Sequence, residues 1–224
     1  MDDHGPNRRA FLGAAALAST ALATAALSDT RTAHAAPQGD WDLSWATRVG
    51  RAKHRVIFDS TEIESGTALM NALLCLRDYG SVYKATDGDM GVVIVMRHIA
   101  LPMVFNDEMW ARMKLGVFTK IKDPLTGEDA GRNPFVHVKP GDKTVLYDTG
   151  AALDTLIGRG VTVLCCNMAL LHFADMLAKA ANIPADEAHK QLAANLIPGT
   201  ILMPSGIFAA ARAQEAGCHY IRST

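Results

Sequence analysis

The sequence has few of the residues that mark specialised protein classes. Only four of its 224 residues are cysteines, and none makes a C-x-x-C pair or a zinc-ligand spacing. This excludes a disulfide framework and a zinc motif of regular spacing. The chain also lacks an excess of either charge, since 22 Lys and Arg stand against 23 Asp and Glu, a net charge of −1. Without a positive field, we expect no binding to nucleic acid or to an anionic membrane.

The common catalytic and nucleotide-binding motifs are missing as well. The sequence contains no G-x-G-x-x-G, Walker A or G-x-S-x-G pattern. His98, His137, His172 and Cys166 are of metal-ligand type, but none is paired at i,i+4 or as H-x-H. We therefore expect neither a cofactor nor a metal. With 49% apolar and 20% charged residues, the composition is that of an ordinary globular protein rather than a disordered or collagen-like one.

The N-terminus has the pattern of an export signal. A twin arginine at 8–9 precedes an alanine-rich apolar run that lasts to Leu27, and Ala-His-Ala follows at 33–35. This is typical of a Tat signal peptide over residues 1–35, and it predicts a periplasmic or exported protein. An uncleaved anchor is the alternative, but serine and threonine within the run make it weakly apolar for a stable membrane span.

The remaining chain is predicted to be an arm followed by one domain. Residues 36–53 are polar and contain Gly and Pro together with two tryptophans, which indicates a linker or N-terminal arm. Residues 54–224 are expected to form a single α/β domain. Within it, residues 116–140 contain turn signals without a sustained period, so they are predicted to be a long insertion. Loops of this length are typically functional lids, partner contacts or disordered segments, and the sequence does not choose among the three.

Strand and helix patterns alternate through residues 54–224. This alternation predicts an α/β fold with a mostly parallel sheet and right-handed crossovers. Strands are expected at His54–Asp59, Gly91–Met96, Val161–Cys165, Thr200–Met203 and His219–Ile221. Helices are expected at Ile63–Leu76, Asn106–Leu115, Val145–Ile157, Ala169–Ala180, Pro184–Leu196 and Gly206–Glu215.

The candidate site lies where the strands end, because ligands of open α/β sheets bind beyond the carboxyl ends of the strands. Cys165 and Cys166 end one strand, and a thiol there faces the positive end of the next helix, which favours the thiolate. Strand alternation sends the two side chains in opposite directions, and Cys165 continues the apolar run. We therefore expect Cys165 to be buried and Cys166 to face the crevice. An inert, buried Cys166 is the alternative.

Two further side chains follow the strand that ends at Met96. Arg97 is a candidate to stabilise a thiolate or an anionic substrate, and His98 is a candidate to exchange protons near neutral pH. Helix capping and surface solvation are the alternative roles for both. Ser205, which precedes the last helix, is predicted to be an N-cap.

Two stretches resemble a known family. In residues 156–170, LIGRGVTVLCCNMAL, a strand runs into a cysteine and a helix. In residues 201–221, ILMPSGIFAAARAQEAGCHYI, a Pro-small-Gly sequence opens a helix that ends in Gly-x-x-Tyr. Both resemble the DsrE/DsrF-like (YchN-type) family of sulfur-relay proteins. The strands at 56–59 and 92–96 match the first two strands of that family, so the resemblance extends over most of the chain from residue 54 onward.

The resemblance implies a flavodoxin-like three-layer sandwich with a mostly parallel five-stranded sheet, assembled as a homo-oligomer, a trimer or a hexamer. It places the sulfur-carrying cysteine at Cys166, which would accept and transfer sulfane sulfur as a persulfide, with a small sulfur-containing donor or acceptor protein as its partner. The alternative function is a non-catalytic periplasmic binding or interaction module with a structural Cys166. A cofactor or metal oxidoreductase is a third hypothesis, which rests on the export route alone.

Overall fold

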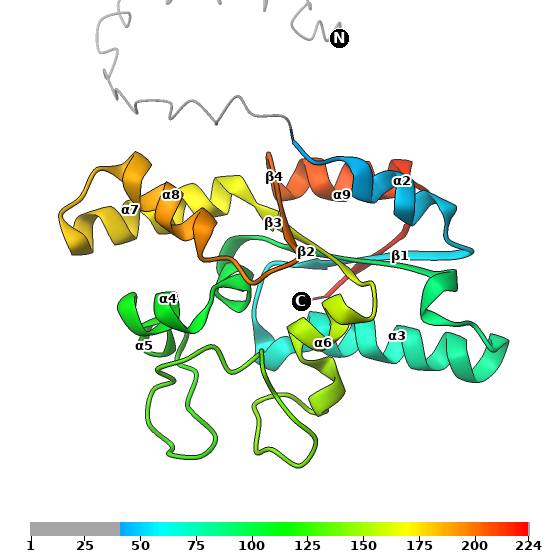
Figure 1. Cartoon of the computed structure of the whole chain (residues 1–224), viewed down its shortest axis with the longest axis horizontal. Helices are drawn as coiled ribbons and strands as arrows, with labels where there is room; N and C mark the ends of the chain where they lie inside the picture. Colours follow the sequence, from blue (N-terminus) through cyan, green and yellow to red (C-terminus); the bar gives the residue numbers. More distant parts are fainter. Residues whose placement is uncertain (1–40, 224) are drawn as a thin grey trace, which may run out of the picture. The chain divides into compact units, whose positions relative to one another are not determined.

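Five parallel strands form the centre of the fold, in the order β4-β3-β2-β1-β5 (Figure 1). The computed structural model describes residues 41–223. The predicted signal peptide, residues 1–35, therefore lies outside the described residues. The strands are β1 (His54–Ser60), β2 (Met90–Met96), β3 (Thr162–Cys166), β4 (Thr200–Met203) and β5 (His219–Arg222).

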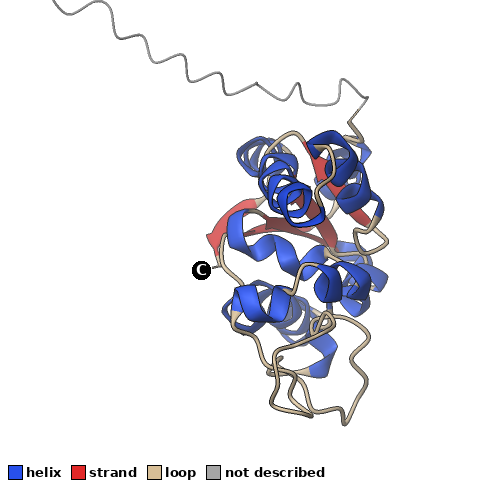
Figure 2. Cartoon of the chain, turned by 90° about the vertical axis from the view of Figure 1, so that its left-hand side faces the viewer, coloured by secondary structure: helices blue, strands red, loops and turns tan. Residues whose placement is uncertain are grey.

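The central strands are almost entirely apolar because both faces of the sheet are covered. Every residue of β2 and β3 is buried, as expected of parallel strands between two layers of helices. One face packs against α3 (Thr67–Tyr83), α6 (Leu153–Gly158) and α7 (Asn167–Ala181), and α8 (Ala185–Ala194) lies beside α7. The other face packs against α2 (Ser44–Arg51) and α9 (Gly206–Glu215). Figure 2 shows helices on both sides of the strands.

The chain order explains which helix covers which face. From β1 to β4 the chain crosses the sheet in one direction, and from β4 it returns to β5 on the far side of β1. Right-handed crossovers place the connecting helices on one face in the first direction and on the opposite face in the second. The helices α3 and α6 therefore share one face, and α9 lies on the other. The α/β fold, a flavodoxin-like three-layer sandwich, is confirmed.

The segment expected as a linker or arm belongs largely to the fold. Residues 44–51 form α2, whose Trp45, Ala46 and Val49 are buried against β2 and α9. Trp45 has no exposed surface. The expectation of a loose arm is therefore wrong for these residues. The three apolar positions lie on one helical face. This pattern is short and lies within a polar sequence, so the helix is stabilised mainly by its packing against the sheet.

Two expected helices are shorter in the structure. The segment predicted as one helix over 106–115 forms α4 (Asp107–Arg112) and α5 (Leu115–Thr119), which are separated by Lys114 in a left-handed conformation with φ of 50°. The helix predicted from Val145 begins only at Leu153. Before it, the Asp148 side chain accepts a hydrogen bond from the backbone N–H of Gly150, and this local turn competes with the helix.

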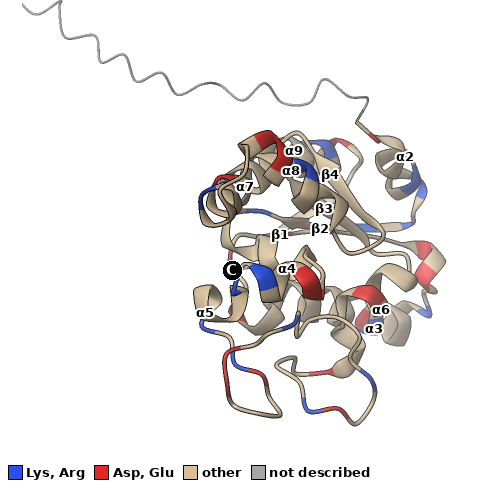
Figure 3. Cartoon of the chain, turned by 60° about the vertical axis from the view of Figure 1, so that its left-hand side comes forward, with Lys and Arg blue, Asp and Glu red and all other residues tan. Residues whose placement is uncertain are grey.

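The predicted insertion, 116–140, begins inside α5 and is anchored to the domain. The Asn133 side chain is buried and donates to the carbonyl oxygens of Met103 and Phe105, at 2.9 and 2.7 Å. The loops between α5 and α6 carry charges of both signs (Figure 3), including the ion pair between Lys122 and Asp129. Buried backbone groups need hydrogen-bond partners, and Asn133 supplies them for the turn that precedes α4.

No helix within residues 41–223 is long and apolar enough to cross a membrane.

Candidate functional site

The carboxyl ends of neighbouring strands bring the predicted site residues to one edge of the sheet. Asp59 lies next to the end of β1, Arg97 and His98 follow β2, and Cys166 ends β3. In the sheet register Met96 pairs with both Ser60 and Cys165, so the three strands end at the same level. The crevice beyond this edge is the usual ligand site of parallel sheets.

Cys166 connects β3 to the first turn of α7. Its sulfur accepts a hydrogen bond from the backbone N–H of Ala169, at 3.4 Å, in the position of a capping side chain. The helix thus begins at the sulfur, where its positive dipole end stabilises negative charge. Cys165 is fully buried, as predicted, and burial raises the pKa of its thiol far above the ordinary range. Cys166 keeps 6% of its surface exposed.

A cavity of about 420 Å³ opens at Cys166. Its walls combine three groups of polar character with a larger apolar surface. The polar groups are Cys166, His98 and His172. The apolar side chains come from the turn after β2, from α5 and from α7: Ile99, Phe118, Met168, Ala169 and Phe173. A cavity of this size holds a small molecule, and its apolar walls limit the water around the sulfur.

His98 enters this cavity from a strained backbone. It directly follows Arg97 after β2 and has a φ of 51°, in the left-handed region that residues other than glycine rarely adopt. It opens the 3₁₀ turn His98–Val104, in which the backbone N–H of Ala100 bonds to the carbonyl oxygens of Arg97 and Thr61. Such conformations persist where the surroundings over-determine them, commonly at functional sites.

Arg97 is held by a carboxylate rather than pointing freely at the sulfur. Its guanidinium forms two hydrogen bonds with Asp59, of 2.7 and 2.8 Å, and the Tyr220 hydroxyl donates to the same carboxylate at 2.7 Å. Burial works against ionisation of Asp59, but the hydrogen bonds from Arg97 and Tyr220 hold its pKa below the ordinary value. The hydrogen bond with Asp59 in turn raises the pKa of Arg97, and Cys166 lies within its electrostatic range.

The last helix fixes the Arg97 side chain from a second side. Ser205 caps α9, as predicted, by accepting a hydrogen bond from the backbone N–H of Phe208 at 3.1 Å. A Cβ at Gly206 would lie 2.5 Å from Cδ of Arg97, so the arginine stem fills the space that a side chain would take. Pro-small-Gly thus has a packing role here, because it leaves room for Arg97 beside the start of α9.

The structure brings two of the three predicted site residues into one cavity. Cys166 and His98 share its walls, whereas Arg97 acts from the side and is paired with Asp59. Sequence reasoning missed Asp59 and Tyr220 as partners of Arg97, and His172 as a neighbour of Cys166. The position of Asp59 near the end of β1 was a usable signal. His172 stands three and four residues after Ala169 and Met168, and this helical spacing also places it toward the cavity.

The start of the predicted insertion supplies one wall of the cavity through Phe118 of α5. The helix α5 approaches the following loop so closely that a Cβ at Gly116 would lie 2.3 Å from the carbonyl oxygen of Ala130. These are backbone atoms, so the loop cannot yield by rotating a side chain. Glycine at 116 is therefore required for this close approach.

Replacement of Gly116 by alanine is expected to lower the free energy of unfolding by about 2 kcal/mol through overpacking. It should also displace Phe118 and open the cavity. Chemical denaturation measures the first effect, and the rate at which iodoacetamide alkylates Cys166 measures the second. Gly131→Ala is the matched control, because a Cβ there meets no atom within 4 Å. Equal stability of the two variants would contradict the close approach.

Within residues 41–223, no group of three or more His, Cys, Asp or Glu side chains is arranged to hold a metal ion.

No protein-family model matches the chain, and no curated protein matches it. Among solved structures, it is similar to a protein of unknown function, MTH1491, from Methanobacterium thermoautotrophicum. The two are 15% identical, and the match covers 75% of this chain and 98% of that chain with a TM-score of 0.38. A likeness this distant does not bear on function. Function is therefore inferred from the geometry around Cys166.

Proposed function

We propose that the protein is an exported DsrE-like thiol protein that accepts and transfers sulfane sulfur as a persulfide on Cys166. The observation that carries the proposal is the position of the Cys166 sulfur, at the start of α7 and in the wall of a cavity that also contains His98 and His172. A helix N-terminus stabilises a thiolate, and an imidazole exchanges protons near neutral pH.

The proposed step exchanges one sulfur–sulfur bond for another. The Cys166 thiol first gives its proton to an imidazole of the cavity, His98 or His172. The thiolate then attacks the outer sulfur of thiosulfate, a new sulfur–sulfur bond forms, and sulfite leaves with the electron pair of the broken bond. A polysulfide donor reacts in the same way and leaves shortened by one sulfur. Transfer to an acceptor thiolate reverses the roles and regenerates Cys166.

The other three thiols are poorly suited to this chemistry. Burial raises the pKa of Cys165 and Cys75, and it raises that of Cys218 to about 11 although Arg55 opposes the shift. The thiolate is the nucleophilic form, so these groups are mostly unreactive at neutral pH. Cys75 is the most accessible of the three, since it is partly exposed whereas Cys165 and Cys218 are buried.

Mass spectrometry of the intact protein after incubation with thiosulfate or polysulfide tests the proposal. We expect a gain of about 32 Da, one sulfur atom, that a reductant removes. Cys166→Ser should abolish the gain, and Cys75→Ser, the matched control, should retain it. Absence of the adduct, or its persistence in Cys166→Ser, would refute persulfide formation at this site.

The second candidate is a non-catalytic binding module, which the capping hydrogen bond of Cys166 and its 6% exposure favour. In this role the sulfur serves α7, and the cavity holds a ligand without reacting. Iodoacetamide distinguishes the two candidates. Faster alkylation of Cys166 in the native protein than in urea indicates an activated thiol, whereas slower native alkylation indicates a structural cap.

The proposal includes export by the Tat route and assembly into a trimer or hexamer. Exposed apolar side chains near the site are consistent with assembly, since Met168 and Ile207 are 59% and 68% exposed at the starts of α7 and α9. Sedimentation velocity of the mature protein measures the assembly, and N-terminal sequencing of exported protein locates the cleavage.

A further inference from the structure

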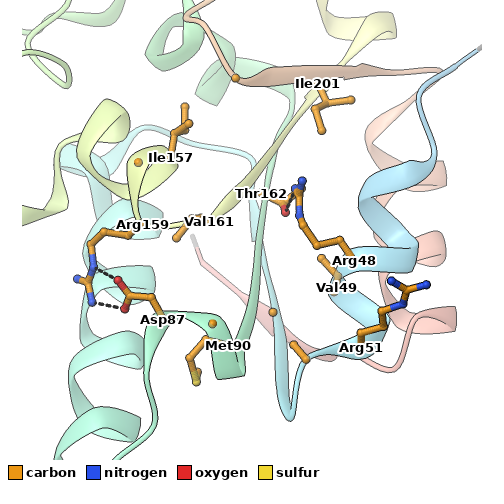
Figure 4. Close-up of a pocket in the computed structure, with 16 residues that line it drawn as sticks. Arg48, Val49, Arg51, Asp87, Met90, Ile157, Arg159, Val161, Thr162 and Ile201 are labelled. Carbon is orange, nitrogen blue, oxygen red and sulfur yellow. Dashed lines mark hydrogen bonds and ion pairs between the residues drawn. The ribbon is translucent and has the colours of Figure 1, made fainter.

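We infer a second ligand site at the opposite edge of the sheet, which takes a small organic anion with an apolar body, such as a medium-chain carboxylate or sulfonate. The site is a cavity of about 710 Å³ at the amino ends of β2, β3 and β4 (Figure 4). It shares no lining residue with the cavity at Cys166. It is therefore independent of the proposed sulfur chemistry.

The cavity contains more positive than negative charge. Of its lining side chains, Arg48, Arg51 and Arg159 are cationic and Asp87 is anionic. Arg159 is neutralised, because its guanidinium forms two hydrogen bonds with Asp87, of 2.9 and 2.7 Å. The positive charges of Arg48 and Arg51 in α2 are therefore not neutralised by Asp87. These two arginines are almost one helical turn apart.

Arg48 is positioned rather than free. Its Nη2 donates to the hydroxyl oxygen of Thr162 at 3.0 Å, and Thr162 is buried at the start of β3. Figure 4 shows Arg48 reaching from α2 to Thr162, opposite the pair of Asp87 and Arg159. One contact leaves most guanidinium N–H groups for a ligand, and the planar fork suits the two oxygens of a carboxylate.

The side chain of Arg51 forms no hydrogen bond or ion pair with any residue in 41–223. Asp42, an acid outside the cavity, interacts electrostatically with Arg48 but forms no hydrogen bond with it. Its carboxylate instead accepts a hydrogen bond from the backbone N–H of Ser44 at 2.9 Å. Two arginines that line the cavity are therefore not bonded to any carboxylate of the described residues. An anionic ligand would supply the missing counter-charge to both arginines.

The rest of the wall determines the body of the ligand. Apolar side chains reach the cavity from several elements: Val49, Met90, Ile157, Val161 and Ile201. The volume lies in the range of small-molecule sites, where apolar walls hold the body and a few polar groups orient it. A bare inorganic anion would leave these walls in contact with water, so the arrangement fits an anion with an aliphatic or aromatic body.

Octanoate, binding to the full-length protein by isothermal titration calorimetry, is the test. We expect octanoate to bind and the double variant Arg48→Gln, Arg51→Gln to weaken it about tenfold or more, since each arginine contributes charge-assisted hydrogen bonds. Octylammonium, with the same chain and opposite charge, should not bind. Arg212→Gln is the matched control, because Arg212 is an arginine of α9 paired with Glu215 outside the cavity.

Two further variants locate the site. Ile201→Trp should fill the cavity and weaken octanoate binding, while Cys166→Ser should leave it unchanged, which separates this site from the proposed sulfur chemistry. Circular dichroism confirms that each variant is folded. Absence of octanoate binding, equal affinity for octylammonium, or an unchanged affinity in the double-arginine variant would each overturn the inference.

Discussion

Replacement of Trp45 by alanine is expected to lower the free energy of unfolding by about 3–5 kcal/mol, the usual loss for a large aromatic side chain in a core. Trp45 has no exposed surface and is part of the core between the sheet and the helices α2 and α9, together with Val93, Leu164 and Ala209. A residue of a loose arm would lose almost nothing on the same substitution. The measurement therefore decides whether α2 is part of the folding unit.

Urea denaturation followed by circular dichroism gives the value, and Trp41→Ala is the matched control. Trp41 precedes α2 and is partly exposed, so its replacement should cost much less. Trp45→Phe should fall between wild type and Trp45→Ala. It keeps most of the apolar surface and removes an indole N–H that has no hydrogen-bond partner within residues 41–223. Similar losses for Trp41→Ala and Trp45→Ala would contradict the packing of α2.

Asp59→Asn is expected to lower the free energy of unfolding by about 3 kcal/mol at pH 7, because it leaves the Arg97 guanidinium without its counter-charge in a largely buried place. The Asp59 side chain is 4% exposed and that of Arg97 is 18% exposed. The same change removes the charged acceptor of the Tyr220 hydroxyl. We also expect the substitution to affect the candidate site, since Arg97 lies within electrostatic range of Cys166.

The pH dependence of this effect has a definite sign. The folded-state pKa of Asp59 lies below its ordinary value of 3.8. Stabilisation by the ionised carboxylate is therefore complete well above pH 3.8, and it is lost as the pH falls through the folded-state pKa. The difference between wild type and Asp59→Asn should accordingly be largest near neutral pH and shrink in acid.

Denaturation at a series of pH values measures both quantities, with Asp148→Asn as the matched control. Hydrogen bonds from Arg77 and Gly150 lower the pKa of Asp148 as well, but this pair is exposed, with 49% of the Arg77 side chain accessible. Exposed pairs contribute about 0–1 kcal/mol. Equal losses in the two variants, or a loss for Asp59→Asn that does not depend on pH, would show that the buried pair is not the source.

Long apolar runs were the most predictable part of the fold. The strands at 91–96 and 161–165 were expected within one residue of β2 and β3, because a strand buried on both faces is a nearly continuous apolar run. The helix boundaries were less predictable. A local hydrogen bond of Asp148 and a left-handed Lys114 interrupt patterns that look helical in the sequence.

The candidate site divides in the same way. Cys166 was predicted because a single chain segment, strand followed by helix, determines its position at a helix N-terminus. His172 and Phe118 were not predicted as its neighbours, because the path of α5 depends on the close contact between Gly116 and Ala130. Tyr220 and Asp59 are 161 residues apart in the chain, so no local sequence pattern could predict their hydrogen bond.

Local patterns in the chain are enough to establish the alternation of strands and helices, the burial of Cys165 and the place of Cys166 at the end of a strand. These features follow from periodicity and from the order of apolar residues, which each segment carries within itself. Three others arise in the folded protein alone: α2 buries one of its faces in the core, Arg97 is paired with Asp59, and two arginines of α2 line a cavity. They depend on contacts between segments far apart in the chain, and a contact of that kind exists only once the sheet has assembled.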